Sequence, residues 1–252
     1  MASKQVTDRE KSSRAVVAAA RTHGEEIAAG FERELKPYLK AGEAWPNVAL
    51  LTTLVGRKIA ADTAALVAAD EAHERELSDD AAPREQRDEA AVKVRGVLVD
   101  LRAAIEAAYG ATGLTQLGVD QAISEDPSVL ARTVAAVAKI LSDASLRLPT
   151  TKRAAMKIDR YGFAEEVGAE LPLLVKGLAL VAKEEREKEA TLRKKQSAMS
   201  MSSRSFMKGA AWLAASCTIA GLDELAAKVR PSGRKPGRTA FEEENEEAPL
   251  EE

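Results

Sequence analysis

Apolar residues recur every three or four positions along most of this chain, and this spacing restricts the fold more than any other feature of the sequence. Such a period places apolar side chains on one face of a helix. Alternating β-branched runs and Asn-Gly or Asp-Gly hairpin turns are absent from the sequence, and the abundant Ala, Leu, Glu, Lys and Arg favour helix. The sequence therefore predicts an all-α fold, a bundle of about six long amphipathic helices.

The boundaries of these helices follow from proline, glycine and capping residues. Asp126-Pro127 is a strong helix start, and Ser78, Asp79 and Asp80 precede another start near Pro83. Leu114, Leu117 and Val119 are expected to point inward from a connector between helices. The expected helices span roughly residues 8–38, 46–77, 83–109, 126–148, 163–195 and 206–229.

The two halves of the chain resemble each other. Residues 65–68 and 179–182 both read Ala-Leu-Val-Ala, and each is followed by a charged run, a polar turn, a helix and a Gly-Leu pair. This succession suggests two related three-helix units, 1–120 and 121–229, the second packed on the first. Shared Ala-rich composition is the alternative explanation. The segment 230–252, first basic and then acidic, is predicted to be a disordered tail.

Cysteine content, charge and hydropathy indicate the compartment. The single cysteine, Cys217, excludes an intramolecular disulfide and fits a reducing compartment. The polar residues 1–10 lack the apolar stretch of a signal peptide. The most apolar segment, Gly209 to Gly221, is shorter than the roughly 20 residues that cross a membrane. A net charge of -3 creates no field that would attract nucleic acid or an anionic membrane. We therefore expect a cytoplasmic protein without membrane association.

Two predicted helices lose their apolar stripe halfway, in segments 71–89 and 184–204, where charged residues occupy nearly every face. A helix that is polar all round either is solvated or engages a partner. We expect both segments to form the tips of helical hairpins that extend beyond the core and contact a protein partner or a second copy; simple solvation is the alternative. The candidate partner-binding residues are Glu74, Arg75, Arg84, Arg87, Glu185, Lys188, Arg193 and Lys194.

Methionines gather near the second predicted tip, at Met199, Met201 and Met207. Methionine suits adaptable binding surfaces. A turn packed against the bundle explains the three residues equally well.

One acidic-x-x-His pattern, Asp70-x-x-His73, hints at metal chemistry, with Glu26 and Glu74 as conceivable further ligands. Carboxylate-bridged sites in helical bundles need two such patterns. The only other histidine, His23, is too far along an antiparallel hairpin to share a metal with His73. We expect His23 to face the core and His73 to be half-exposed. A metal-binding helical-bundle enzyme or storage protein around Asp70 and His73 remains the alternative function.

Other chemistry is weakly indicated. Cys217 lies on a stripe of small residues, which predicts a buried structural thiol. No phosphate-binding or nucleophile motif is present, so we expect no catalytic residue and no cofactor. The basic segments 152–160 and 230–238 could bind nucleic acid, but glutamates between 242 and 252 would compete for the same cations. The sequence favours a non-catalytic helical interaction or scaffold protein that engages a protein partner or itself.

Overall fold

The computed structural model describes residues 3–79, 81–153, 156 and 158–247. In this part of the chain the regular structure is helical, and the only β-type pairing is an isolated bridge between Pro231 and Thr239. The predicted all-α class is thereby confirmed. None of the described helices has an apolar stretch long enough to cross a lipid bilayer.

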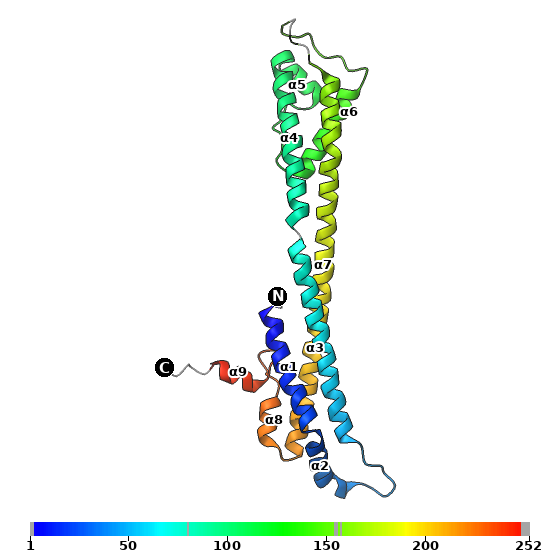
Figure 1. Cartoon of the computed structure of the whole chain (residues 1–252), viewed down its shortest axis with the longest axis vertical. Helices are drawn as coiled ribbons and strands as arrows, with labels where there is room; N and C mark the ends of the chain where they lie inside the picture. The colour runs from blue at the N-terminus through cyan, green and yellow to red at the C-terminus, as the bar shows by residue number, and fades with distance from the viewer. Residues whose placement is uncertain (1–2, 80, 154–155, 157, 248–252) are drawn as a thin grey trace. The chain divides into compact units, whose positions relative to one another are not determined.

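Figure 1 labels the helices in chain order. Their bounds are α1 (Lys4–Thr22), α2 (Gly24–Leu35), the 3-10 turn η1 (Lys36–Tyr38), α3 (Val48–Asp79), α4 (Ala81–Tyr109), α5 (Ala111–Leu117), α6 (Pro127–Ser142), α7 (Arg160–Ile219), α8 (Asp223–Val229) and α9 (Ala240–Glu247).

The helices gather into two compact units. Unit 1 comprises Met1–Glu76 and Lys188–Glu252, and unit 2 comprises Leu77–Glu187. Helix α7 contributes its first part to unit 2 and its second part to unit 1. These bounds differ from the sequence halves 1–120 and 121–229, and the internal duplication stays a prediction.

Unit 1 is built on an antiparallel pair, α3 and the second part of α7. Gly209 lies against Ile59, and Thr191 bonds to His73, so residue numbers rise along one helix as they fall along the other. Helix α1 packs beside the pair and completes the core (Figure 1). Buried members of this core are Val16, Ala20, Ile27, Ile59, Phe206, Ala210, Leu213 and Cys217.

Unit 2 surrounds a core of leucine, isoleucine and valine from α4, α5, α6 and the first part of α7. The expected start of α6 is confirmed, because the Asp126 carboxylate accepts hydrogen bonds from the backbone N–H groups of Ser128 (2.8 Å) and Val129 (2.9 Å). The connector residues Leu114, Leu117 and Val119 are buried, as predicted.

Several helix boundaries differ from expectation. The expected single helix 8–38 ends at Thr22 and restarts at Gly24, glycine being the weakest helix former after proline. The turn expected after residue 195 is absent, because α7 continues without a break to Ile219. No glycine or proline occurs between Gly177 and Gly209, so nothing in that stretch opposes the helix. Segment 184–204 is therefore not a hairpin tip.

Within the tail that was expected to be disordered, residues 230–247 carry an isolated bridge and helix α9; residues 248–252 lie outside the described part of the chain. The Ser232 hydroxyl accepts hydrogen bonds from the N–H groups of Arg234 (3.1 Å) and Lys235 (2.8 Å) and donates to the buried Glu243 carboxylate. Thr239 and Glu242 form a reciprocal cap at the start of α9. Glu242 also accepts from Ser12 of α1. Capping and these buried contacts order a segment whose composition suggested disorder.

Gly30 of α2 shows how closely parts of unit 1 approach each other. A Cβ at this position would lie 2.4 Å from the Ala220 Cβ and 2.6 Å from its Cα. At Gly96 of α4, by contrast, an added Cβ would meet nothing within 4 Å. Gly30→Ala is therefore expected to destabilise the fold by about 1–3 kcal/mol through overpacking, whereas Gly96→Ala should stabilise it by up to about 1 kcal/mol. Urea unfolding followed by circular dichroism measures both changes, and a stabilised Gly30→Ala variant would contradict the close approach.

Candidate partner-binding groove

The charged residues predicted to bind a partner are divided between the two units. Glu74, Arg75, Lys188, Arg193 and Lys194 belong to unit 1, and Arg84, Arg87 and Glu185 belong to unit 2. Glu74 and Lys188 are half-buried, while Arg84, Glu185 and Lys194 are exposed. Several of the arginines bond locally: Arg87 to Asp88, Arg193 to Glu189 and Arg75 to the Glu71 carbonyl. Because the eight candidate residues are divided in this way, neither unit contains the complete set.

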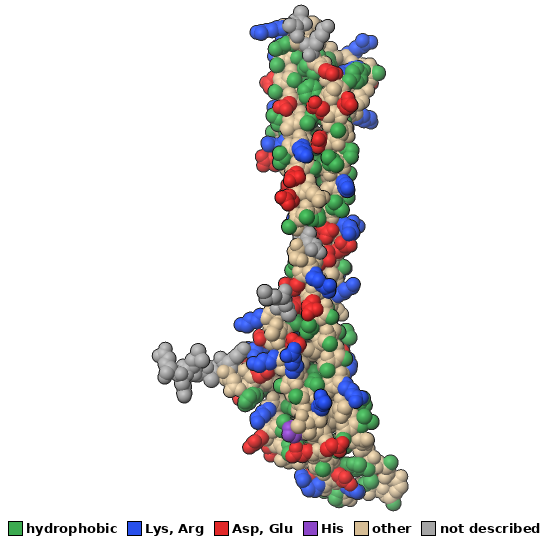
Figure 2. Space-filling view, viewed as in Figure 1, with side chains coloured by type: hydrophobic (Ala, Val, Ile, Leu, Met, Phe, Trp, Pro, Cys, Tyr) green, Lys and Arg blue, Asp and Glu red, His purple; other side chains and the backbone are tan. Residues whose placement is uncertain are grey.

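The ends of the basic segment 152–160 make structural contacts inside unit 2. The Lys152 ammonium donates to the Glu106 carbonyl at 3.0 Å. The Arg160 guanidinium donates to the carbonyls of Asp143 (3.2 Å) and Leu146 (3.3 Å) and lies over the Tyr161 ring. These contacts tie the segment after α6 to the neighbouring helices. In Figure 2, basic and acidic side chains alternate along the visible face, without a broad region of one sign.

Asp70 and His73 lie in a buried polar cluster rather than an open site. The fully buried Asp70 carboxylate lies 2.6 Å from the Lys195 ammonium and accepts from the Ser3 N–H at 2.7 Å. The His73 Nδ1 is 3.1 Å from the Thr191 hydroxyl. Burial opposes ionisation of Asp70, but the hydrogen bonds from Lys195 and Ser3 outweigh burial and hold its pKa below the ordinary value. The contacts on this carboxylate join α3, α7 and the N-terminal segment.

The burial of the two histidines is the reverse of the prediction. His73 is buried, whereas His23 is partly exposed at the break between α1 and α2 and bonds to Glu26 at 2.8 Å. His73 is buried because α7 runs alongside α3 at this height, which the periodicity of α3 alone could not reveal.

Cys217 is fully buried, as predicted. Burial, with a smaller contribution from the Glu26 carboxylate, raises the pKa of its thiol to about 11. A thiol with such a pKa carries almost no thiolate at neutral pH, so Cys217 is a packing residue.

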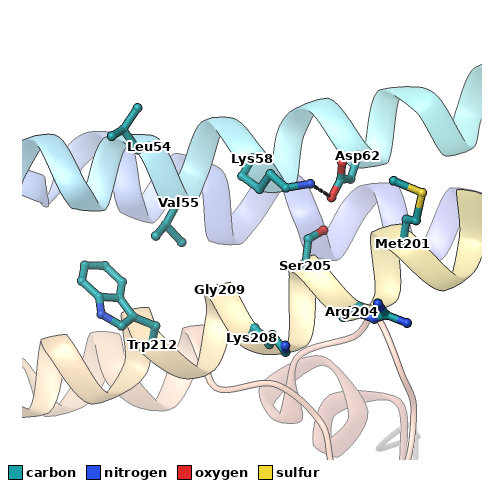
Figure 3. Close-up of a pocket in the computed structure, with 10 residues that line it drawn as sticks. All are labelled: Leu54, Val55, Lys58, Asp62, Met201, Arg204, Ser205, Lys208, Gly209 and Trp212. Carbon is teal, nitrogen blue, oxygen red and sulfur yellow. Dashed lines mark hydrogen bonds and ion pairs between the residues drawn. The ribbon is translucent and has the colours of Figure 1, made fainter.

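A largely apolar groove lies between α3 and α7 in unit 1, with a volume of about 530 Å³. Its apolar lining comes from Leu54 and Val55 on α3 and from Met201 and Trp212 on α7. Val55 and Trp212 point into the space between the two helices (Figure 3). Leu54 is 48% exposed and Met201 55% exposed, so large apolar side chains are left open to solvent here. We refer to this feature as the α3–α7 groove.

At one end of the groove, the floor is formed where α7 contacts α3 closely. A Cβ on Gly209 would lie 2.7 Å from the Ile59 Cδ1 and 3.0 Å from the Val55 Cγ1. The absence of a side chain at Gly209 therefore lets α7 lie directly on α3 between Val55 and Ile59. The exposed Leu50 and Leu51 continue the apolar surface of α3 toward its N-terminus.

Charges on the groove are predominantly positive. Lys58 and Asp62 pair across one turn of α3 at 2.5 Å. Burial opposes ionisation of Asp62, but hydrogen bonds from Lys58 and Ser205 lower its pKa overall. Because Asp62 offsets Lys58, the net positive charge comes from Arg204 and Lys208 on α7. An apolar floor beside two such cations suits a ligand that is both apolar and acidic.

Of the groove residues, Met201 stands out in the sequence as a member of the methionine cluster, which fits either an adaptable binding surface or a packed turn. Helix α7 continues through Met201, so there is no turn at this position. The signal that could have located the groove is the surplus of apolar residues on α3, where Leu50, Leu51 and Leu54 lie outside the buried stripe of Thr52 and Ile59. Only the antiparallel pairing of α3 with α7 brings those residues beside Met201 and Trp212.

Comparisons with known proteins found no family model, no curated protein and no solved structure that matches this chain.

Proposed function

We propose that this chain is a non-catalytic, cytoplasmic helical interaction protein that binds a helix of a partner protein in the α3–α7 groove. The observation that carries the proposal is the groove itself, where exposed Leu54, Met201 and half-buried Trp212 surround a volume of about 530 Å³. Apolar side chains that are exposed together on a protein surface are a common mark of a partner-binding site.

The geometry of the groove suits a helix as the occupant. Its α7 lining residues, Met201, Ser205, Lys208 and Trp212, recur at spacings of three and four and form one face over about 17 Å. Two antiparallel helices already form the walls, and α1 covers the other side of the pair. A further helix in the groove would complete a four-helix arrangement, in the way that amphipathic helices bind apolar grooves elsewhere.

Charge favours an acidic partner helix. Arg204 and Lys208 lie beside the apolar lining, and no described carboxylate pairs with either. Glutamates that flank the apolar stripe of a partner helix would meet these cations and speed its association.

Two designed amphipathic peptides test the proposal. One is acidic, and the other is a basic version in which lysine replaces every glutamate. Trp45→Phe leaves Trp212 as the single tryptophan, so its emission reports occupation of the groove. We expect the acidic peptide to shift Trp212 emission to shorter wavelength, and Arg204→Glu with Lys208→Glu to weaken its binding by about tenfold or more.

The matched control reverses two exposed charges of unit 1 outside the groove, Arg21→Glu and Lys40→Glu. It should bind the acidic peptide like the parent protein. Equal binding of the acidic and basic peptides, or full binding by the Arg204/Lys208 variant, would refute the proposal. If light scattering shows a dimer that Met201→Glu dissociates, the occupant is a second copy of the chain.

The other hypotheses from the sequence receive less support. The exposed Arg84, Glu185 and Lys194 remain proposed as secondary contacts for a partner. A metal at Asp70 would have to displace Lys195 and Ser3 from its carboxylate. Nucleic acid would have to compete with the internal contacts of Lys152 and Arg160.

A further inference from the structure

A second cavity lies on another face of unit 1, between α1, α8 and the C-terminal segment that ends in α9. Its volume is about 580 Å³, which is in the range of pockets for small ligands. It exists because residues 230–247 are ordered: Thr239, Phe241 and Asn245 supply one wall. None of its lining residues belongs to the α3–α7 groove.

Positive charge converges on this cavity from three elements. Lys11 comes from α1, Lys228 from α8 and Arg238 from the turn before α9. Lys11 and Lys228 have no ion-pair partner among the described residues, and Arg238 lies 3.8 Å from Asp8. The cavity therefore holds an excess of cations.

The one carboxylate that lines the cavity is already engaged. Glu242 accepts hydrogen bonds from the Ser12 hydroxyl, from the Thr239 N–H at 3.3 Å and from the Thr239 hydroxyl at 3.0 Å. All three bonds fall on Oε2 and hold Glu242 in the cap of α9. Among the described residues, no ion pair joins this carboxylate to Lys11 or Lys228. An anion from solution would find donors in both lysines and in the Asn245 amide.

The rest of the lining is apolar. Ala15 and Ala19 follow Lys11 along one face of α1, and Leu225 and Val229 flank Lys228 on α8. Phe241 is 46% exposed at the edge, although it belongs to a short, highly charged helix. An aromatic ring left open beside small aliphatic residues provides a surface on which a planar or aliphatic body can pack.

We propose that this cavity binds a small amphipathic anion, a molecule with one carboxylate or phosphate group and an apolar body. The anionic group would lie between Lys11 and Lys228, and the apolar body would lie against Ala19, Val229 and Phe241. The site does not rest on the proposed partner helix, since it lies on different helix faces and uses different residues.

Calorimetric titration of the full chain with three probes of one shape tests the site: 2-naphthoate, 2-naphthyl phosphate and the uncharged 2-naphthylmethanol. Both anions should bind more tightly than the alcohol, by about tenfold. The anion that binds more tightly, 2-naphthoate or 2-naphthyl phosphate, identifies the preferred head group. Inorganic phosphate, which has no apolar body, should bind more weakly than the naphthyl phosphate.

Lys11→Gln with Lys228→Gln should weaken binding of both naphthyl anions by roughly fivefold or more, and should leave binding of the alcohol unchanged. Lys40→Gln with Lys139→Gln makes the same change in charge at exposed sites elsewhere and should have no effect. Phe241→Ala should weaken binding of all three naphthyl probes and leave binding of inorganic phosphate unchanged. Absence of binding by both anions, equal binding of anions and alcohol, or unchanged affinity in the Lys11/Lys228 variant would overturn the proposal.

Discussion

Replacing Lys195 with methionine is expected to destabilise unit 1 by about 3–5 kcal/mol, because it leaves the Asp70 charge buried without its cation. Asp70 has no exposed surface, and the Lys195 ammonium lies 2.6 Å from its carboxylate. The remaining hydrogen bonds from Ser3 cannot neutralise that charge. Both tryptophans, Trp45 and Trp212, lie in unit 1, so urea unfolding followed by tryptophan fluorescence reports this unit.

The effect should depend on pH with a definite sign. The pKa of Asp70 is lower in the folded protein than its ordinary value of 3.8, so the ion pair stabilises the fold above that value. This stabilisation is lost as the pH falls through the folded pKa. In Lys195→Met, burial of Asp70 without its cation raises the carboxyl pKa instead. The difference in stability between the two proteins should therefore narrow as the pH is lowered toward 3.8 and below.

Lys194→Met is the matched control, since the neighbouring Lys194 is exposed. We expect it to change stability by less than about 0.5 kcal/mol. Equal stability of the Lys194 and Lys195 variants would show that the pair contributes nothing to the fold. A difference that does not change with pH would show that the carboxylate charge is not the cause.

Phe206→Ala is expected to destabilise unit 1 by about 3–5 kcal/mol, because it removes the largest fully buried side chain of the core and leaves a cavity. Phe206 is 1% exposed and packs in the core that contains Val16, Ile59 and Leu213. Tryptophan fluorescence in urea again measures the change.

Met201→Ala on the same helix separates packing from binding. Met201 is 55% exposed in the α3–α7 groove, so its truncation should change the free energy of unfolding by less than about 1 kcal/mol. The same truncation should weaken binding of the acidic peptide. A loss of stability as large as that of Phe206→Ala would mean that the groove residue is part of the core.

The internal resemblance of the two halves still awaits a test, and the units do not follow it. Residues 65–68 lie in unit 1 and residues 179–182 lie in unit 2, each at the stage where a long helix changes from apolar to charged. In α7 that change does not end the helix. The charge pattern therefore identified where α7 stops contributing to the core of unit 2. It did not indicate that the same helix continues into the core of unit 1.

Local features of the chain were sufficient for the helical class and for several helix ends. The cap at Asp126-Pro127, the inward Leu114, Leu117 and Val119, and the buried Cys217 all follow from residues that are close in sequence. Periodicity and capping act within one or two helical turns, and for that reason they can be recognised without the fold.

Features that join distant segments were decided by the tertiary structure. His73 is buried and Asp70 is paired only because the second part of α7 lies along α3, and the contact between Glu242 and Ser12 ties residues 230–247 to α1. The α3–α7 groove has the same origin, since Leu54 and Met201 are ordinary exposed residues until the two helices lie side by side. The sequence by itself determined which faces of the helices are apolar. Which faces meet, and which are left open, depends on packing between helices that are far apart along the chain.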